Sequence, residues 1–328
     1  MYLITGATGH VGNTLIRHLL AVDSACKIRA FVLPNSNLAS LEGLDVEIFY
    51  GNVLNPDDIA QAMEGIEIVF HLAGIIAISD RNSEIVEKVN IQGSINVAKS
   101  ALQANVRRMI HVASIHIFER VPAGVIDERI PLVTRENAAG IYDYTKAEAV
   151  RQLRDITKQG LDIVFACPTG IFGPNDYLGS EFGKTIRSYL EGTKHSTVKG
   201  GYDWVDVRDV AKGLTALIDK GETGELHLLG GNYASTEDLI LTIGKILNKS
   251  YEISFVPYPA LRVMASVMSM LSKLFNTQPS LTVYSLRTLR DNANISHQKA
   301  SNVLGYRSRP FEETLRDTIA WYQAHPLD

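Results

Sequence analysis

The sequence is poor in cysteine, and it has neither a long apolar run nor a strong excess of one charge. Its 328 residues include two cysteines, Cys26 and Cys167, too few for a disulfide framework or a cysteine metal cluster. Since no run of about eighteen apolar residues is present, we expect no membrane span. The formal net charge is −4 and no basic run occurs, which argues against a nucleic-acid partner.

The rest of the composition is that of an ordinary globular protein. Hydrophobic residues make up 45% of the chain and charged residues 21%. The length allows one large domain or two. A glycine-rich turn begins at residue 6, which leaves no room for a signal peptide before it. We therefore expect a cytoplasmic protein, and we expect no metal.

The glycine-rich turn is the most informative feature that is present. A short apolar run leads into Gly6, Gly9 and Gly12, and an amphipathic helical pattern follows. Glycines let the backbone turn sharply and approach a phosphate without an intervening Cβ atom, and a helix N-terminus offers free N–H groups. The spacing is G-x-x-G-x-x-G instead of the more familiar G-x-G-x-x-G. Its place between a strand and a helix predicts dinucleotide binding.

Apolar segments alternate with helical patterns through the first half of the chain. Such continuous apolar strands predict an α/β fold with a doubly wound, Rossmann-type parallel sheet. We expect strands at 27–33, 46–50, 66–72, 109–113, 162–167 and 225–229, and helices near 56–64, 84–104 and 144–158. The regularity weakens after Pro168, where glycine and proline cluster and the tail becomes mostly helical.

This change of pattern predicts two domains. The dinucleotide-binding domain is expected at 1–170, with a later contribution from about 205–231. The smaller, mostly helical substrate-binding domain is expected at 171–204 and 232–328.

A second informative motif lies near residue 142. Tyr142 and Lys146 are four residues apart in a helical pattern, so their side chains share one helix face. A nearby ammonium group favours the phenolate and lowers a tyrosine pKa from its usual value of about 10, which makes the pair a candidate general acid and base. Ser114 ends the apolar run 109–113, where parallel-sheet ligands bind, and is a candidate hydrogen-bond donor to a substrate oxygen.

Together these motifs resemble the short-chain dehydrogenase/reductase superfamily in its extended form, the NAD-dependent epimerase/dehydratase family. Further segments similar to family motifs run along the whole chain. They are residues 71–74, 89–96, 168–174, 204–211 and 296–310.

The resemblance implies roles for individual residues. Tyr142 would exchange a proton with the substrate oxygen, and Lys146 would lower its pKa and hold the nicotinamide ribose. Ser114 would polarise the carbonyl group, and Asn90 would help to hold a water-linked proton path. The residues implied to bind NAD or NADP are Gly6, Thr8, Gly9, His10, Val11, Gly12, Leu33, Asn52, Val53, Leu72, Ala73, Gly74, Tyr142, Lys146, Pro168, Thr169, Gly170 and Ile171.

Two departures from the family pattern concern the cofactor. Residues 32–37 hold neither an acid for the ribose hydroxyl of NAD nor an arginine for the extra phosphate of NADP, so the choice stays open. Asn35 and Ser36, at an expected helix start, would bind a phosphate or cap the helix. Asn52 stands where an aspartate commonly reads the adenine amino group.

On the substrate side the chain is similar to dihydroflavonol reductases and 3β-hydroxysteroid dehydrogenases. Tyr202 and Tyr284 stand where the family's sugar-nucleotide epimerases usually carry arginines, although Arg287 and Arg290 lie nearby and would substitute for one of them. His116 lies where the dehydratases carry an acidic pair. His116 and Tyr202 are the candidate substrate contacts; the alternative for His116 is a structural polar role.

We therefore expect an NAD(P)-dependent oxidoreductase that interconverts a secondary alcohol and a carbonyl group on a small, mostly apolar substrate. One alternative is a nucleotide-sugar epimerase, and another is a non-catalytic dinucleotide sensor. A small molecule is the expected partner, and a homodimer stays open. The methionine-rich segment 261–275 is expected to be a substrate lid, a surface-seeking segment, a subunit interface or core.

Overall fold

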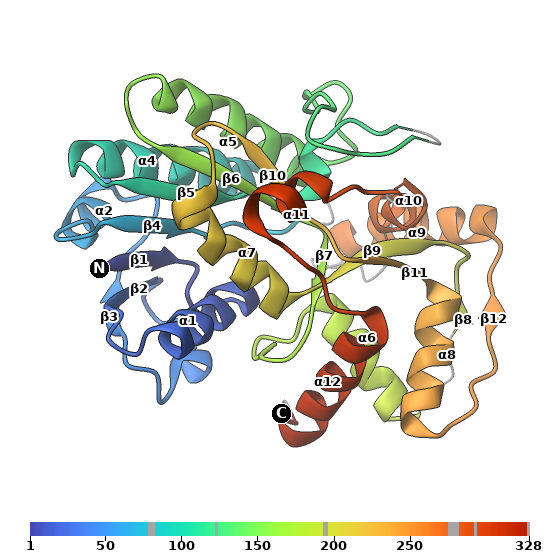
Figure 1. Cartoon of the computed structure of the whole chain (residues 1–328). Helices are drawn as coiled ribbons and strands as arrows, with labels where there is room; N and C mark the ends of the chain where they lie inside the picture. The colour runs from blue at the N-terminus through green and yellow to red at the C-terminus, as the bar shows by residue number, and fades with distance from the viewer. Residues whose placement is uncertain (78–82, 122–123, 193–195, 275–281, 292–293, 327–328) are drawn as a thin grey trace.

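The centre of the molecule is a seven-stranded parallel sheet with the strand order β3-β2-β1-β4-β5-β6-β10 (Figure 1). The computed structural model describes residues 1–77, 83–121, 124–192, 196–274, 282–291 and 294–326. The sheet strands are β1 (Tyr2–Thr5), β2 (Ile28–Val32), β3 (Glu47–Tyr50), β4 (Ile68–His71), β5 (Arg108–Val112), β6 (Ile163–Pro168) and β10 (Leu226–Leu229). The predicted doubly wound sheet is confirmed.

The apolar strand pattern follows from burial on both faces. Every residue of β4 and β6 is buried, which is why these segments read as continuous apolar runs. Strands β1, β2 and β3 follow one another toward one edge of the sheet, and β4 then returns to the opposite side of β1. Strands β1 and β4 pair in parallel from Tyr2↔Ile68 to Thr5↔His71, and the switch point of the strand order lies between them. Ligands of such sheets bind at this switch point, beyond the carboxyl ends of the strands.

Helices cover both faces of the sheet (Figure 1). Helices α1 (His10–Val22) and α7 (Val207–Lys220) pack together on one face. The other face carries α2 (Pro56–Ala62), α4 (Ser94–Gln103) and α5 (Ile141–Thr157). The single helix expected at 84–104 is instead α3 (Ser83–Glu87), a π-helical stretch η2 (Lys88–Gly93) and α4. A π-turn inserts a wider loop of backbone, and here it carries the buried Asn90.

The later part of the chain builds two small sheets and several helices beside the main sheet. The sheets have the orders β11-β9-β7 and β12-β8. Their strands are β7 (Gly170–Phe172), β8 (Ser196–Thr197), β9 (Gly201–Asp206), β11 (Asn232–Ser235) and β12 (Ser254–Phe255). The helices are α6 (Glu181–Leu190), α8 (Thr236–Leu247), α9 (Tyr258–Leu274), α10 (Val283–Asp291), α11 (Gln298–Leu304) and α12 (Phe311–Ala324). Two short 3₁₀ turns, η1 (Ala39–Leu41) and η3 (Ile115–Ile117), lie in the first half of the chain. None of the helices within the described ranges is long and apolar enough to cross a membrane.

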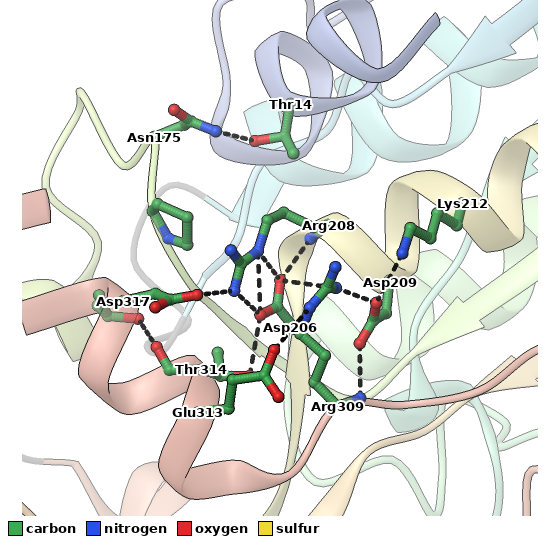
Figure 2. Close-up of polar contacts among 12 residues, drawn as sticks. Thr14, Asn175, Asp206, Arg208, Asp209, Lys212, Arg309, Glu313, Thr314 and Asp317 are labelled. Carbon is green, nitrogen blue, oxygen red and sulfur yellow. Dashed lines mark hydrogen bonds and ion pairs between the residues drawn. The ribbon is translucent and has the colours of Figure 1, made fainter. Parts of the chain in front are cut away.

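A buried ion cluster joins the start of α7 to the segment around α12 (Figure 2). Asp206 caps α7 by accepting from the Arg208 backbone N–H at 2.7 Å, and it also accepts from the Thr314 hydroxyl at 2.9 Å. Asp209 accepts from the Arg309 backbone N–H at 2.7 Å and pairs with the Arg309 guanidinium. Both carboxylates are 2% exposed. The 204–211 motif therefore ties together elements about a hundred residues apart.

Candidate active site

The glycine-rich turn has the shape of a phosphate cradle. Gly6 has φ of 69°, and a Cβ atom there would lie 2.9 Å from the backbone nitrogen of Ala73. A Cβ atom on Gly12 would overlap the carbonyl oxygen of Gly6, so α1 packs directly on the turn. Gly9 begins α1 with no side-chain cap, which leaves the first helical N–H groups to a ligand. This geometry fits the pyrophosphate of a dinucleotide.

A hydrogen-bond chain beneath the turn fixes the strand ends. Thr5 Oγ1 accepts from the backbone N–H groups of Leu72 and Ala73, both at 3.2 Å, so its own proton goes to His71 Nδ1 at 2.8 Å. The other nitrogen of His71 then donates to Ser94 Oγ at 3.0 Å. Burial lowers the pKa of His71 to about 3, which keeps the ring neutral. No local pattern in the sequence indicates this series of hydrogen bonds.

Asn90 connects the π-helical stretch to the site. Its Oδ1 accepts from Ile75 N at 2.7 Å, and its Nδ2 donates to Ile75 O and to Thr145 Oγ1, both at 3.1 Å. A Cβ atom on Gly74 would lie 3.2 Å from Asn90 Oδ1 and 3.7 Å from Lys146 Nζ. Glycine at position 74 therefore leaves room beside both side chains.

Ser114, Tyr142 and Lys146 come together at the carboxyl end of β5. The first turns of α5 carry the tyrosine and the lysine, and Lys146 Nζ donates to Val112 O at 2.5 Å. Ser114 follows β5, caps η3, and its side chain is hydrogen-bonded to Tyr142. Tyr142 itself lies in the cavity wall, where burial dominates its titration.

The direction of the Tyr142 pKa differs from the sequence-based expectation. Burial raises the pKa of Tyr142 to about 12, and the hydrogen bond from Ser114 opposes this rise. Burial also lowers the pKa of Lys146 to about 8. The expectation of a lowered Tyr142 pKa is therefore wrong, because desolvation of the phenolate and the nearby charge of Asp143 both raise the pKa.

The three residues line one cavity of about 570 Å³. Most of its walls are apolar or aromatic, and they come from both halves of the chain. The lining residues include Val11, Leu72, Gly74, Ile76, Ser114, His116, Tyr142, Lys146, Pro168, Thr169, Gly170, Ile171, Phe182, Tyr202, Trp204, Tyr284 and Leu289. The predicted catalytic residues, both predicted substrate residues and several predicted cofactor residues thus share a single space.

Asp143 and Tyr284 complete a polar cluster that sequence reasoning missed. Tyr284 on α10 donates its hydroxyl to Asp143 Oδ1 at 2.6 Å, and Asp143 is 2% exposed. His116 lies beside this pair and within hydrogen-bond distance of Tyr202, at 2.6 Å. The contact between residues 143 and 284 spans 141 positions in sequence, and no local pattern announces it.

The other predicted cofactor residues lie around the same strand ends. Leu33 is 55% exposed beyond β2. Asn52 Oδ1 accepts from Leu54 N at 2.9 Å, and Val53 is buried against Gly93. His10 contacts Pro174 O through Nε2 at 2.9 Å, so its ring faces the 168–174 loop.

No helix begins at Asn35 and Ser36, contrary to the sequence-based expectation. Asn35 has φ of 65°, and Ser36 N donates to Leu33 O at 3.1 Å in a turn. The following residues form the 3₁₀ turn η1, where Asn37 Oδ1 accepts from Ala39 N at 2.8 Å. Asparagine tolerates the left-handed conformation, which explains why it stands in the turn.

The methionine-rich helix α9 has one buried edge and one exposed apolar edge. Leu261 and Ala265 pack with Leu286 of α10. Met264 is 46% exposed and Met270 69% exposed. Residue 275, the end of the predicted segment, lies outside the described residues. The exposed methionines do not belong to the core of this chain, and the role of the segment stays a prediction.

Comparison with known proteins places the chain in a family. The model of the NAD dependent epimerase/dehydratase family matches residues 2–230. The chain belongs to this family. Among the described residues of this epimerase/dehydratase-family chain, no group of three or more His, Cys, Asp or Glu side chains is placed to hold a metal ion.

Relatives of this epimerase/dehydratase-family chain match it over nearly its full length. It is 30% identical to sterol demethylase protein B of Methylococcus capsulatus, covering 98% of each chain. It is 26% identical to a putative dihydroflavonol 4-reductase of Synechocystis sp., covering 99% of this chain and 95% of the relative. The solved structure titled gox2253 is 28% identical with a TM-score of 0.86, covering 99% of this chain and 98% of that one.

Proposed function

We propose that this chain interconverts a secondary alcohol and a carbonyl group on a small, mostly apolar substrate, with a nicotinamide dinucleotide as its redox partner. The observation that carries the proposal is the meeting of Ser114, Tyr142 and Lys146 in one cavity. That cavity opens beside the glycine-rich turn, at the carboxyl ends of the parallel strands.

Each of the three side chains has a distinct task. Ser114 Oγ accepts from the His116 backbone N–H at 3.2 Å, which leaves its single hydroxyl proton for Tyr142 in this structure and for the substrate oxygen when a carbonyl compound binds. With a pKa of about 12, Tyr142 keeps its proton at neutral pH and serves as the acid in carbonyl reduction. The Lys146 ammonium, with a pKa of about 8, would hold the ribose of the cofactor and add positive charge there.

The cofactor would lie along the switch point of the sheet. The Gly6–Gly12 turn would hold its pyrophosphate, and Leu72–Gly74 with Pro168–Ile171 would border the nicotinamide end. When bound, the nicotinamide ring supplies or accepts the hydride. The family is NAD dependent, and the assay described below compares the activity of this chain with NAD and with NADP. Cytoplasmic location and a homodimer stay predictions.

The walls of the cavity favour an apolar substrate over a nucleotide sugar. Ile76, Phe182, Trp204 and Leu289 face the space, and no arginine is among the described lining residues. Sterol and dihydroflavonol also appear in the names of two relatives. The epimerase alternative predicts micromolar binding of a UDP- or TDP-sugar instead.

The test measures steady-state oxidation and reduction of a panel of ring alcohols and ketones. The reactions are monitored by the absorbance of the nicotinamide, once with NAD and once with NADP. Tyr142→Phe removes one hydroxyl, and turnover should fall by about 10²–10⁴-fold. Tyr144→Phe, on the same helix but outside the cavity lining, is the matched control and should keep parental turnover. Near-parental turnover in Tyr142→Phe, with a deuteride isotope effect showing that chemistry limits the rate, would refute the proposal. Cofactor binding without any turnover in the parent would instead indicate a dinucleotide sensor.

A further inference from the structure

Helix α9 presents an apolar face to the outside of the molecule. Four apolar residues between 46% and 69% exposed recur at i, i+1, i+4 and i+7, so they share one side of the helix. They are Val263, Met264, Val267 and Met270. On the other side of the helix, Leu261 and Ala265 are buried and pack with Leu286 of α10. The inward side of α9 thus completes a small core, while its outward side is available to a partner.

The charge of the same stretch of sequence has one sign. Between Glu252 and Asp291 the sequence contains no Asp or Glu and four cationic residues. They are Arg262, Lys273, Arg287 and Arg290. The whole chain, in contrast, has more acids than bases, 36 against 32. The apolar face of α9 therefore belongs to a locally cationic segment of an acidic protein.

Polar groups near α9 are placed beside the apolar face and not within it. Arg262 is exposed and shares the polar edge of the helix with Ser266, at i+4. The Ser266 hydroxyl donates to Arg262 O at 2.9 Å, so it needs no water. Near the start of the helix, the exposed Arg290 of α10 has its guanidinium carbon 4.6 Å from the centroid of the Tyr258 ring. Such long cationic side chains can reach an aqueous boundary while the apolar face leaves water.

An anionic lipid surface is complementary to both features. In an interfacial helix the apolar side chains enter the acyl region, and the flanking Arg and Lys side chains meet the anionic headgroups. The flexible side chains of Met264 and Met270 adapt to irregular apolar surroundings. A second copy of this chain is less complementary, because a two-fold contact through α9 would bring the same cations, and no acid of this segment, from both sides.

We propose that the exposed face of α9 docks this protein on a lipid surface that carries anionic headgroups, with the helix lying in the plane of that surface. Helix α10 lies between α9 and the cavity: its Leu286 packs on α9, whereas four of its other residues line the cavity. These are Tyr284, Ser285, Thr288 and Leu289. Docking would therefore bring one wall of the cavity close to the lipid, where an apolar substrate, which rests on the proposed function, would also gather.

The first experiment measures binding of the full chain to vesicles by flotation. The parent should bind vesicles of phosphatidylcholine and phosphatidylglycerol in equal parts, and Val267→Gln combined with Met270→Gln should weaken this binding by about tenfold or more. Leu241→Gln is the matched control, because Leu241 is an apolar residue of α8 that is 57% exposed, and it should keep parental binding. A parent that does not bind these vesicles, or a double variant that binds as tightly as the parent, would overturn the proposal.

The second experiment tests the contribution of charge. Binding to vesicles of phosphatidylcholine alone should be about tenfold weaker or more, and added salt should weaken binding to the mixed vesicles. Arg262→Gln should weaken binding to the mixed vesicles and leave binding to phosphatidylcholine unchanged. Lys158→Gln, which removes an exposed cation at the end of α5, is the control and should bind as the parent does. Equal binding of the parent to both kinds of vesicle would contradict recognition of anionic headgroups.

Sedimentation without lipid distinguishes a lipid surface from a second copy of the chain. The parent and the Val267→Gln, Met270→Gln double variant should have the same oligomeric state. A parent dimer that the double variant dissociates would overturn the proposal, because a second copy would then cover the apolar face of α9.

None of these measurements depends on turnover, so this inference and the proposed function can fail separately. Vesicle binding by a chain that oxidises and reduces none of the test compounds would refute the proposed function alone. Turnover by a chain that binds no anionic vesicle would refute the docking alone.

Discussion

Replacing Lys146 by methionine should make the protein more stable while it removes activity. The Lys146 side chain is buried, with 5% of the residue exposed, and burial lowers its pKa from 10.5 to about 8. One pKa unit corresponds to about 1.4 kcal/mol, so the charged lysine lowers the free energy of unfolding by roughly 3 kcal/mol at pH 7. Methionine has a similar shape and no charge, so it avoids that cost.

The lost hydrogen bond reduces the gain. Lys146 Nζ donates to Val112 O at 2.5 Å, and the variant leaves this carbonyl without that donor. Losing such a bond costs about 1 kcal/mol. The net expectation at pH 7 is that Lys146→Met raises the free energy of unfolding by about 2 kcal/mol.

The pH dependence makes the reasoning testable. Below pH 8 the lysine is charged in both the folded and the unfolded chain, and the full penalty is present. Between pH 8 and 10.5 the folded state releases the proton before the unfolded state does, so the stability of the parent rises with pH. At pH 10 the remaining penalty is about 1 kcal/mol, which the lost hydrogen bond offsets, so the two proteins should be about equally stable.

Denaturant unfolding of parent and variant at pH 7 and pH 10 measures this difference. Lys158→Met is the control, because Lys158 directly follows the same helix as its C-cap, with its side chain 76% exposed, and should show no comparable pH effect. An effect of Lys146→Met that is the same at both pH values would refute the lowered lysine pKa. Turnover and cofactor affinity of Lys146→Met should both fall.

Two further predictions concern the turn and the ion cluster. Gly12→Ala should destabilise the fold by about 1–3 kcal/mol, because its Cβ atom would overlap the Gly6 carbonyl oxygen. Gly9→Ala, whose Cβ atom would lie 3.2 Å from that oxygen, should stay folded and weaken cofactor binding. Thermal unfolding measures the stabilities and calorimetry the cofactor binding, and equal stabilities of the two variants would contradict the packing argument. Arg309→Met should cost about 3 kcal/mol at pH 7, since it leaves the buried Asp209 carboxylate with only the Lys212 ammonium, 3.9 Å away, as a cation. Burial already raises the pKa of Asp209, so the loss should shrink as the pH falls and the carboxyl group is protonated. A loss in denaturant unfolding that is constant from pH 7 to pH 5 would argue against a poorly compensated charge.

Most of the sheet could be predicted from the sequence because its strands are buried on both faces. A strand such as Ile163–Pro168 shows this as an unbroken apolar run, and the glycine spacing at Gly6–Gly12 shows the turn. Tyr142 and Lys146 could be predicted because their four-residue spacing is a local relation within one helix. The substrate class that these residues serve is not encoded in any such local pattern.

What could not be predicted depends on contacts between distant segments or on burial. The π-helical stretch Lys88–Gly93 has the same apolar periodicity as an ordinary helix. The pairing of Asp143 with Tyr284 depends on how α10 packs, and nothing near either residue in the sequence indicates it. The pKa of Tyr142 depends on how deeply the phenol group is buried. The four-residue spacing indicates that Lys146 is a neighbour, but it carries no information about the desolvation of the phenolate.

The ion cluster of Figure 2 has a consequence for the order in which the molecule is completed during translation. Asp206 and Asp209 leave the ribosome about a hundred residues before Thr314 and Arg309, which are their partners. The nascent chain therefore keeps two hydrated carboxylates at the start of α7 until the C-terminal segment arrives. The Gly6–Gly12 turn and the residues that line the cavity, the last of which is Leu289, are all synthesised before the partners of this cluster, so the proposed site is complete in sequence before the cluster can form.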